Sequence, residues 1–430
     1  PVLNVTGRIT MREVQTDSPA LFADFDDDGS VEDCPGSVCT TVSFDAAQDT
    51  LIFDVTHFTT YTTDDTTKGQ GILQCSVVSG SKNLSADINA TGDCITIDQD
   101  NVVLDCQHHT INYSQTGVGN GIIATNLTNI TIQNCDLVNV ERSGSHAINF
   151  TQIKNSTVIN NTMTVRGTFS AGIRLDNTTN TLITNNTINV TGATANKYGV
   201  HLFRGATNNT IANNTIVANG TSQNNGIRLE GNAYNNTVIT NFILTSGTST
   251  DNHGIQINAT SSGNLITGNI INTSSAGSNA HGIQLEGGAA NTTVLNNNIS
   301  TGITSSNYGI HLNGESGRIV TDNLVQQNVI RTSGSGASNV GILLESLVYN
   351  NTVRNNTINT TGSSTDHGIY LFNVVSGNTV VDNVINVNSS GASNGIRIET
   401  SAQNNTIANN TMHTRGASAN RGMVLITSAN

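Results

Sequence analysis

The sequence contains no tryptophan, three prolines among its 430 residues, and only 4% aromatic residues. Charged residues make up 11% of the chain, lysine is nearly absent, and the formal net charge at pH 7 is −13. This balance argues against a nucleic-acid partner, because the phosphate backbone has to be neutralised by Lys and Arg. No apolar run is long enough to cross a bilayer, so we expect no transmembrane segment.

Asn, Thr, Ser and Gly dominate instead, with Ile, Val and Leu recurring at regular intervals. The stretch "NNTIANNTI", residues 208–216, repeats one phrase within nine residues, and relatives of that phrase recur along most of the chain. A second phrase, Gly-Ile-X-Leu, recurs at spacings of 25 to 28 residues, with one spacing of 32 between Gly309 and Gly341. Two phrases that keep step with each other indicate a true repeat.

Each repeat holds three short segments in which β-branched residues alternate with polar ones, separated by Gly, Asn and Ser turns. Such segments are typical of strands, and the helix formers that a two-helix repeat needs are scarce. Three strands per coil, stacked about 4.8 Å apart, pair in parallel with the coils above and below. The prediction is an all-β fold, with a right-handed parallel β-helix of about 13 coils over residues 67–430.

An Asn two residues before an apolar residue marks one corner of every coil. Identical Asn side chains stacked in register can pass amide hydrogen bonds from coil to coil. Asn also tolerates the left-handed backbone that a tight corner requires. The predicted structural ladder comprises Asn161, Asn186, Asn214, Asn241, Asn269, Asn297, Asn328, Asn356, Asn383 and Asn410.

All six cysteines lie before residue 136, without the CxxC pairs of a zinc site, which favours disulfides and an oxidising compartment. Aligning "NVVLDCQHHTI" with "NITIQNCDLV" puts Cys106 and Cys135 at the Asn corner of consecutive coils, close enough for a disulfide. We expect the other four to pin the first coil and to close a small loop. These two pairs are Cys75 with Cys94 and Cys34 with Cys39.

The segment "CITIDQDNVVLDCQHHTINYSQTG", followed by repeats such as "NGIRL" and "NNTVITNFI", resembles the right-handed parallel β-helix superfamily. More narrowly, it is similar to archaeal surface proteins and to the periplasmic copper-protein maturation type. The resemblance covers residues from about 70 to 430. The superfamily includes pectin-degrading enzymes, epimerases, adhesins, phage tailspikes and structural rods, so the fold alone implies no single function.

Residues 1–66 alternate apolar and polar residues in "GRITMREV", "CTTVSFD" and "TLIFDVTHFTTYTT", as in a small antiparallel β-domain. The last of these is similar to the closing strand of β-sandwich domains that precede such rods in archaeal envelope proteins. Within this region "DFDDDG" places Asp24, Asp26 and Asp28 at alternating positions before Gly29. That pattern suits a calcium loop, although Pro35 stands where an EF-hand has Glu; the alternative is a solvated acidic turn.

The outward position of Gly-Ile-X-Leu is where a β-helix enzyme would carry its catalytic groups, and no carboxylate pair for hydrolysis occurs there. We therefore predict no enzyme activity. Glu230, Glu286, Glu345 and Glu399 follow that position and are expected to form a solvated edge paired with Arg. The outward residues are Arg174, His201, Arg228, Gln256, Gln284, His311, Leu343, Tyr370 and Arg397.

Rings occupy the position before Gly in several coils. His253 and His281 fall in adjacent coils, which leaves a metal site open as an alternative to plain ring stacking. Tyr198, Tyr308 and Tyr370 are the candidate platforms for a sugar ring along the rod. The histidines in this column are His146, His253, His281 and His367.

Asn-X-Ser/Thr sequons are spread over the chain, although an Asn- and Thr-rich sequence also generates them by chance. With the cysteines, and with a first residue, Pro1, that suggests removal of an upstream segment, they predict an extracellular or cell-surface protein. We expect N-linked glycans on the protein and, apart from the calcium alternative, no cofactor. The predicted acceptors are Asn83, Asn126, Asn155, Asn160, Asn185, Asn213, Asn235, Asn355 and Asn409.

The function favoured at this level is structural: a glycosylated subunit of a filament or cell-envelope assembly. An open coil at residues 400–430 and a short β-domain at 1–66 are complementary in kind, which favours head-to-tail self-association. A polysaccharide-binding adhesin is the alternative, and a polysaccharide lyase or epimerase is a third interpretation.

Overall fold

The computed structural model describes residues 7–12, 19–24, 32–33, 39–45, 50–55, 60–65 and 72–426, with 141, 274–276, 305, 316, 337 and 417–419 left out. The chain divides into two compact units, Pro1–Leu73 and Gln74–Asn430. This division falls slightly after the boundary expected between residues 66 and 67. None of the described residues forms a helix that is long and apolar enough to cross a membrane.

The described residues of the first unit form two small antiparallel sheets, as the alternating pattern predicts. Inward residues Leu51, Phe53 and Val55 of one strand are buried, while their neighbours are half-buried. One sheet has the order β1 (Gly7–Arg12), β5 (Thr50–Val55), β4 (Cys39–Asp45), and the other β3 (Glu32–Asp33), β2 (Pro19–Asp24), β6 (Thr60–Asp65).

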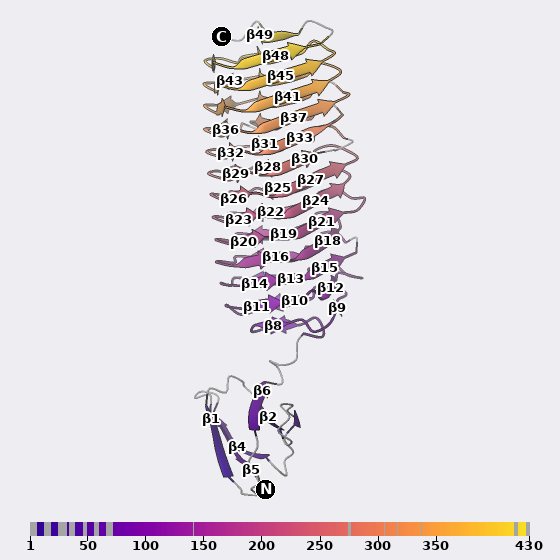
Figure 1. Ribbon diagram of the computed structural model, residues 1–430, viewed down its shortest axis with the longest axis vertical. Coiled ribbons are helices and arrows are strands. Elements are labelled where there is room, and N and C mark those ends of the chain that lie inside the picture. Colours follow the sequence, from indigo (N-terminus) through magenta and orange to yellow (C-terminus); the bar gives the residue numbers. More distant parts are fainter. Residues whose placement is uncertain are drawn as a thin grey trace. The chain divides into compact units, whose positions relative to one another are not determined.

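The second unit is a stack of coils with three long parallel sheets, here called sheet 1, sheet 2 and sheet 3 (Figure 1). Consecutive strands of each sheet come from consecutive coils and pair in register, so the all-β coil stack is confirmed. Sheet 1 has 14 strands, and sheets 2 and 3 have 13 each, in agreement with about 13 coils.

Sheet 1 carries the Gly-Ile-X-Leu phrase. Its strands are β7 (Val77–Val78), β10 (Ile95–Ile97), β13 (Ile122–Thr125), β16 (Ile148–Thr151), β19 (Ala171–Asp176), β22 (Tyr198–Phe203), β25 (Asn225–Leu229), β28 (Ile255–Ile257), β31 (Ile283–Glu286), β34 (Ile310–Asn313), β38 (Val340–Glu345), β42 (His367–Phe372), β46 (Asn394–Glu399) and β49 (Arg421–Leu425).

Sheets 2 and 3 carry the two Asn-Thr-Ile phrases of each coil. Sheet 2 comprises β8 (Lys82–Asn83), β11 (Val103–Asp105), β14 (Thr131–Gln133), β17 (Thr157–Ile159), β20 (Leu182–Thr184), β23 (Thr210–Ala212), β26 (Thr237–Ile239), β29 (Leu265–Thr267), β32 (Thr293–Leu295), β36 (Leu324–Gln326), β40 (Thr352–Arg354), β44 (Thr379–Val381) and β47 (Thr406–Ala408). Sheet 3 comprises β9 (Ile88–Asn89), β12 (Thr110–Tyr113), β15 (Asp136–Asn139), β18 (Thr162–Arg166), β21 (Thr187–Thr191), β24 (Thr215–Gly220), β27 (Phe242–Gly247), β30 (Ile270–Thr273), β33 (Asn298–Ile303), β37 (Val329–Gly334), β41 (Thr357–Gly362), β45 (Val384–Ser389) and β48 (Thr411–Arg415). A short corner sheet joins β35 (Val320–Thr321), β39 (Val348–Tyr349) and β43 (Val375–Ser376).

The glycine of Gly-Ile-X-Leu is required by close packing in the core. A Cβ atom on Gly226 would lie 2.3 Å from Cγ2 of Ile243 in the same coil and 2.7 Å from the carbonyl oxygen of Gly254 in the next coil. Neither atom lies at the end of a flexible chain that could move away easily. The phrase therefore begins with glycine because sheet 3 packs directly behind this position.

At the corner between sheets 2 and 3, one residue forms an amide ladder and the residue before it adopts the left-handed backbone conformation. In each amide ladder step the Asn oxygen accepts the backbone N–H and the side-chain N–H of the Asn one coil earlier. For Asn241 and Asn269 these distances are 2.9 Å and 3.0 Å. The ladder Asn is buried and has ordinary backbone angles; the left-handed residue is the exposed one before it, such as Asn213 (φ 56°). Assigning the left-handed conformation to the ladder Asn itself was therefore wrong, because a side chain at φ > 0 points outward from this corner.

The corner between sheets 1 and 2 has a second ladder, which the sequence analysis did not identify. Asn209 donates its backbone and side-chain N–H to the oxygen of Asn236 at 2.9 Å and 3.0 Å, and Asn236 does the same to Asn264. Thr292 interrupts the column by donating only its backbone N–H to Asn323. "NNTIANNTI" therefore contains both corners of one coil, Asn208-Asn209 and Asn213-Asn214. The ladder resumes through Asn351, Asn378 and Asn405.

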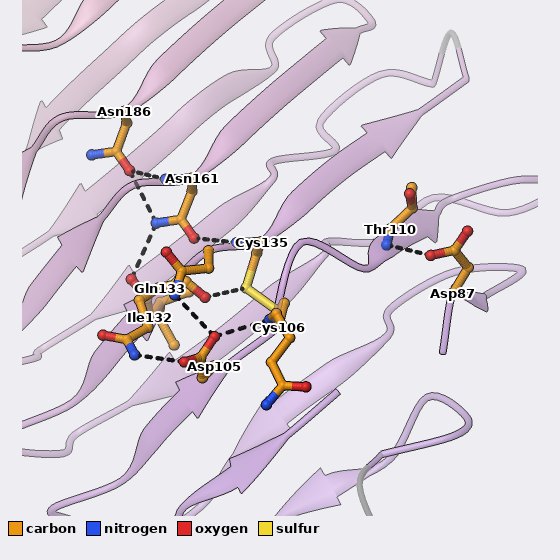
Figure 2. Close-up of a disulfide and its surroundings, with 11 residues drawn as sticks. Asp87, Asp105, Cys106, Thr110, Ile132, Gln133, Cys135, Asn161 and Asn186 are labelled. Atoms are coloured by element: carbon orange, nitrogen blue, oxygen red, sulfur yellow. Dashed lines mark hydrogen bonds between the residues drawn. A yellow bond between two sulfur atoms is a disulfide. The ribbon is translucent and has the colours of Figure 1, made fainter. Parts of the chain in front are cut away.

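The first ladder ends on a disulfide. Cys106 and Cys135 are bonded across consecutive coils with a Cα–Cα distance of 4.7 Å, and the backbone N–H of Cys135 donates to Asn161 at 2.9 Å (Figure 2). A covalent bond thus takes the place of an amide step in the first coils. Cys75 and Cys94 form the second disulfide. Cys39 is also disulfide-bonded, while Cys34 lies outside the described residues.

The predicted calcium loop falls largely outside the described residues. Asp24 ends β2, and Asp26 and Asp28 are not described. Among the described residues no group of three or more metal-binding side chains is close enough to hold an ion.

Candidate functional site

A groove of about 870 Å³ runs over the outer face of sheet 1, from the turn before β16 to β38. These eight strands extend on the order of 30 Å along the stack at the usual strand spacing. The outward residues of Gly-Ile-X-Leu form its floor, the residues before Gly form one wall, and the glutamates two positions later form the other. The structure thus brings three predicted columns together in one site.

Four side chains at β22 and β25 form a connected hydrogen-bonded group, here called the proximal cluster: Tyr198, His201, Arg228 and Glu230. His201 Nε2 is 2.8 Å from Glu230 Oε1, and Arg228 Nη2 is 2.5 Å from Glu230 Oε2. Arg228 Nη1 donates to the hydroxyl of Tyr198 at 3.1 Å, and the guanidinium lies over the tyrosine ring. Glu230 therefore balances the charge of the Arg228 guanidinium, and the contacts with Glu230 and Tyr198 hold this side chain in one orientation.

Burial sets the protonation of this cluster. Burial lowers the pKa of His201, which makes the ring neutral and Nε2 a donor to Glu230. Burial raises the pKa of Glu230, but the hydrogen bond from His201 and the charge of Arg228 outweigh it, so the pKa stays below its usual value. The cluster therefore presents one fixed pattern of donors and acceptors.

The middle of the groove is uncharged on its floor. Asn225 donates to Gln256 at 2.7 Å, and Gln256 donates to Gln284 at 3.2 Å and to Glu286 at 2.7 Å. Burial, and then the charge of Glu315, raise the pKa of Glu286. The glutamates are thus half-buried rather than a fully solvated edge, and the expected pairing with Arg is found for Glu230 and Glu399.

The histidines before Gly bind the backbone of the next coil through Nδ1. The backbone N–H of His281 donates to His253 Nδ1 at 3.2 Å, and that of Tyr308 donates to His281 Nδ1 at 3.2 Å. Burial lowers the pKa of His253 to about 3 and that of His281 well below its usual value. The rings of His253, His281 and Tyr308 lie 4.9 Å and 4.6 Å apart, so they form the stacked arrangement that was the alternative to a metal site.

His146 and His367 repeat this arrangement. Their Nδ1 atoms accept the backbone N–H of Ala171 at 3.0 Å and of Asn394 at 3.1 Å. Burial lowers the pKa of His146 to about 3 and that of His367 to about 4.

The exposed ring of the groove is Phe169, which the sequence analysis missed. Its side chain is 58% exposed and its backbone has φ 55°, an unfavourable conformation for a bulky residue. Of the predicted tyrosine platforms, Tyr198 is buried and Tyr308 and Tyr370 are half-buried: Arg228 lies over Tyr198, Arg397 lies over Tyr370, and Tyr308 stacks on His281. A lone Phe in a turn carries no periodic signal, so only the fold reveals its position.

Two buried nitrogens at the groove have no hydrogen-bond partner within the described part of the chain. They are Nε of Arg228 and Nδ1 of His311. A buried polar atom without a partner is costly, which makes both atoms candidates for ligand contacts.

The predicted glycan acceptors all lie on the exposed surface of the rod. Asn160, Asn185, Asn213, Asn355 and Asn409 precede the first ladder. Asn155 and Asn235 are at the other corner, and Asn83 and Asn126 lie in the first coils.

The model of the family described as "Right handed beta helix region" matches residues 72–271 and 244–412. A comparison with curated protein sequences finds no match to this chain. Among solved structures, the chain is similar to two A-modules of mannuronan C-5 epimerases from Azotobacter vinelandii. AlgE6 has 14% identity and TM-score 0.46, covering 82% of this chain and 92% of that one. AlgE4 has 13% identity and TM-score 0.47, covering 82% and 91%.

A further similarity is to the tailspike of E. coli bacteriophage HK620, solved in complex with a hexasaccharide. It has 12% identity and a TM-score of 0.42, and the match covers 80% of this chain and 70% of that one.

Proposed function

The chain belongs to the right-handed β-helix family, and we propose that it binds a neutral, hydroxyl-rich polysaccharide along the sheet 1 groove. The observation that carries this proposal is the groove itself: an elongated hollow whose floor consists of imidazole rings, amides and paired arginines. Fixed donors and acceptors of this kind suit sugar hydroxyls, which both donate and accept.

The charge of the groove favours a neutral chain over an acidic one. Its lining has two arginines, Arg174 and Arg228, against five carboxylates, and both arginines already pair with neighbouring acids. A uronate polymer would therefore meet net negative charge inside a protein of net charge −13. This disfavours the lyase or epimerase interpretation, whose substrates are acidic.

We propose that the protein is exported and acts as an adhesin-like rod. The disulfides favour an oxidising compartment, and we propose an extracellular or cell-surface location with N-linked glycans on the exposed corners. Head-to-tail self-association into a filament stays a prediction, as does calcium binding in the first unit.

Calorimetric titration tests the proposal. Xylan, mannan and glucan, with their trisaccharides, are compared with oligogalacturonate and alginate, with and without calcium. We expect at least one neutral polymer to bind and the acidic ones not to. Tight binding of an acidic chain without calcium, or no binding at all, would contradict the proposal.

Two variants locate the site. Phe169→Ala removes the exposed ring and should weaken binding about tenfold, or about 1.4 kcal/mol. Phe242→Ala is the matched control, because this ring is 44% exposed on sheet 3. Equal effects of both changes would place the ligand elsewhere.

A further inference from the structure

Four side chains at β42 and β46 reproduce the proximal cluster. In this distal cluster, Arg397 Nη2 is 2.5 Å from Glu399 Oε2, and the guanidinium lies over the ring of Tyr370. The hydroxyl of Tyr370 donates to Glu399 Oε1, and Arg397 Nη1 is 3.4 Å from Nε2 of His367. The arginine again contacts both the glutamate and a tyrosine ring.

The two clusters correspond position by position. The differences 198 to 367, 201 to 370, 228 to 397 and 230 to 399 are all 169 residues, which is six strands of sheet 1. The only change is that histidine and tyrosine are exchanged between the position before Gly and the outward position. In both clusters the arginine lies over the tyrosine ring, and the outward ring bonds the glutamate.

The intervening coils show that this arrangement is not a general consequence of the fold. Tyr308, His311 and Glu345 occupy the equivalent positions once more, with His311 Nε2 3.2 Å from Glu345. The arginine position there holds Leu343, which is buried. Further coils carry Gln256 and Gln284 at the outward position. Within the described part of sheet 1, the full set of four side chains is thus present twice, at β22 and β25 in the middle of the sheet and at β42 and β46 near its last strand.

The distal cluster has its own hollow. A depression of about 380 Å³ is lined by His367, Tyr370, Arg397 and the half-buried ring of Phe372. It shares Tyr308 and Glu345 with the large groove, so the two hollows adjoin along the stack. A chain molecule lying along sheet 1 would pass from one to the other.

We infer that the distal cluster is a second sugar subsite, equivalent to the proximal one, and that one polysaccharide chain occupies both. This inference rests on the proposed function and extends it: the ligand is a polymer long enough to bridge six coils, on the order of 29 Å at the usual strand spacing. Joining two weak subsites by one chain raises the apparent affinity by about 10²-fold or more without a new contact.

Arg397→Leu tests the inference in the full chain. This change recreates the Leu343–Glu345 pair that the fold already contains, so the coil is expected to form. Arg228→Leu is its proximal counterpart, and Arg354→Leu, on sheet 2, controls for the loss of a positive charge. Tyr370→Phe removes only the hydroxyl that bonds Glu399 and serves as the second distal variant.

Titrations of the neutral polymers and of their trisaccharides give the readout. We expect each distal variant to bind one trisaccharide fewer than the wild type and to bind the polymer at least tenfold more weakly. If the distal variants match the wild type while Arg228→Leu binds neither ligand, the second subsite is refuted and the proposed function stands. If neither Arg228→Leu nor Arg397→Leu changes binding, the proposed function itself fails.

Discussion

At the scale of single residues, the two asparagines of each Asn-Asn phrase have different roles. The first Asn adopts the left-handed backbone and faces solvent, and the second is buried and bonded to the coils before and after its own. Because Asn offers one acceptor and two donors on a short side chain, it satisfies the backbone groups that a corner leaves unpaired. The ladder is thus a substitute for the strand ladder where the chain turns.

Replacing a central ladder residue tests this role. Asn269→Leu leaves the amide of Asn241 and its backbone N–H without their acceptor, so the free energy of unfolding should fall by about 1–3 kcal/mol. Asn296→Gly, at an exposed left-handed position one coil later, is the control and should change it by less than about 0.5 kcal/mol. Urea unfolding measures both. Equal stability of the two variants would show that the ladder contributes nothing.

At the scale of elements, sheet 1 differs from the other sheets because its starting glycines touch the core of the same coil. Gly226→Ala forces a methyl group against Ile243 and should lower the free energy of unfolding by about 1–3 kcal/mol. Gly422→Ala occupies the same position of the phrase in the last described coil, where a Cβ would meet nothing within 4 Å. It should unfold like the wild type, and a loss as large as that of Gly226→Ala would contradict this packing account.

The histidine column makes sheet 1 sensitive to acid. The folded pKa values of His146 and His253, about 3, lie far below the unfolded value of about 6.5. Between these pH values the unfolded chain binds more protons than the folded chain. The stabilisation that depends on these neutral histidines is therefore fully present above about pH 6.5 and is lost as the pH falls towards 3. Each such histidine contributes a slope of about 1.4 kcal/mol per pH unit.

The substitution His281→Asn separates the contribution of the histidines to the pH dependence of stability from the contribution of the carboxylates. Asn225 already accepts the backbone N–H of His253 through its oxygen, at 3.2 Å, so His281→Asn can serve Tyr308 in the same way without titrating. Between pH 4.5 and 6.5 the stability of His281→Asn should depend less steeply on pH than that of the wild type. Parallel curves from chemical unfolding would refute the role assigned to the column.

At the scale of the whole molecule, the periodic features were predictable and the cross-coil contacts were not. The repeat, the first ladder column and the position of Cys106 beside Cys135 follow from spacing, because a stack turns sequence period into adjacency. The covering of Glu286 and Tyr198 depends on the side chains of neighbouring coils, and the place of Phe169 depends on one turn. The spacing of residues in the sequence predicts neither the contacts between coils nor the position of a side chain in a single turn.

Oxidative footprinting of the aromatic rings tests the central claim, that sheet 1 carries the ligand, most directly. The wild-type protein is exposed to hydroxyl radicals with and without the neutral polymer that binds it, and the modified residues are counted by mass spectrometry. The account predicts that the polymer slows oxidation of Phe169 on the groove and leaves Phe242 on sheet 3 unchanged. Protection of Phe242 with Phe169 still fully reactive would contradict it.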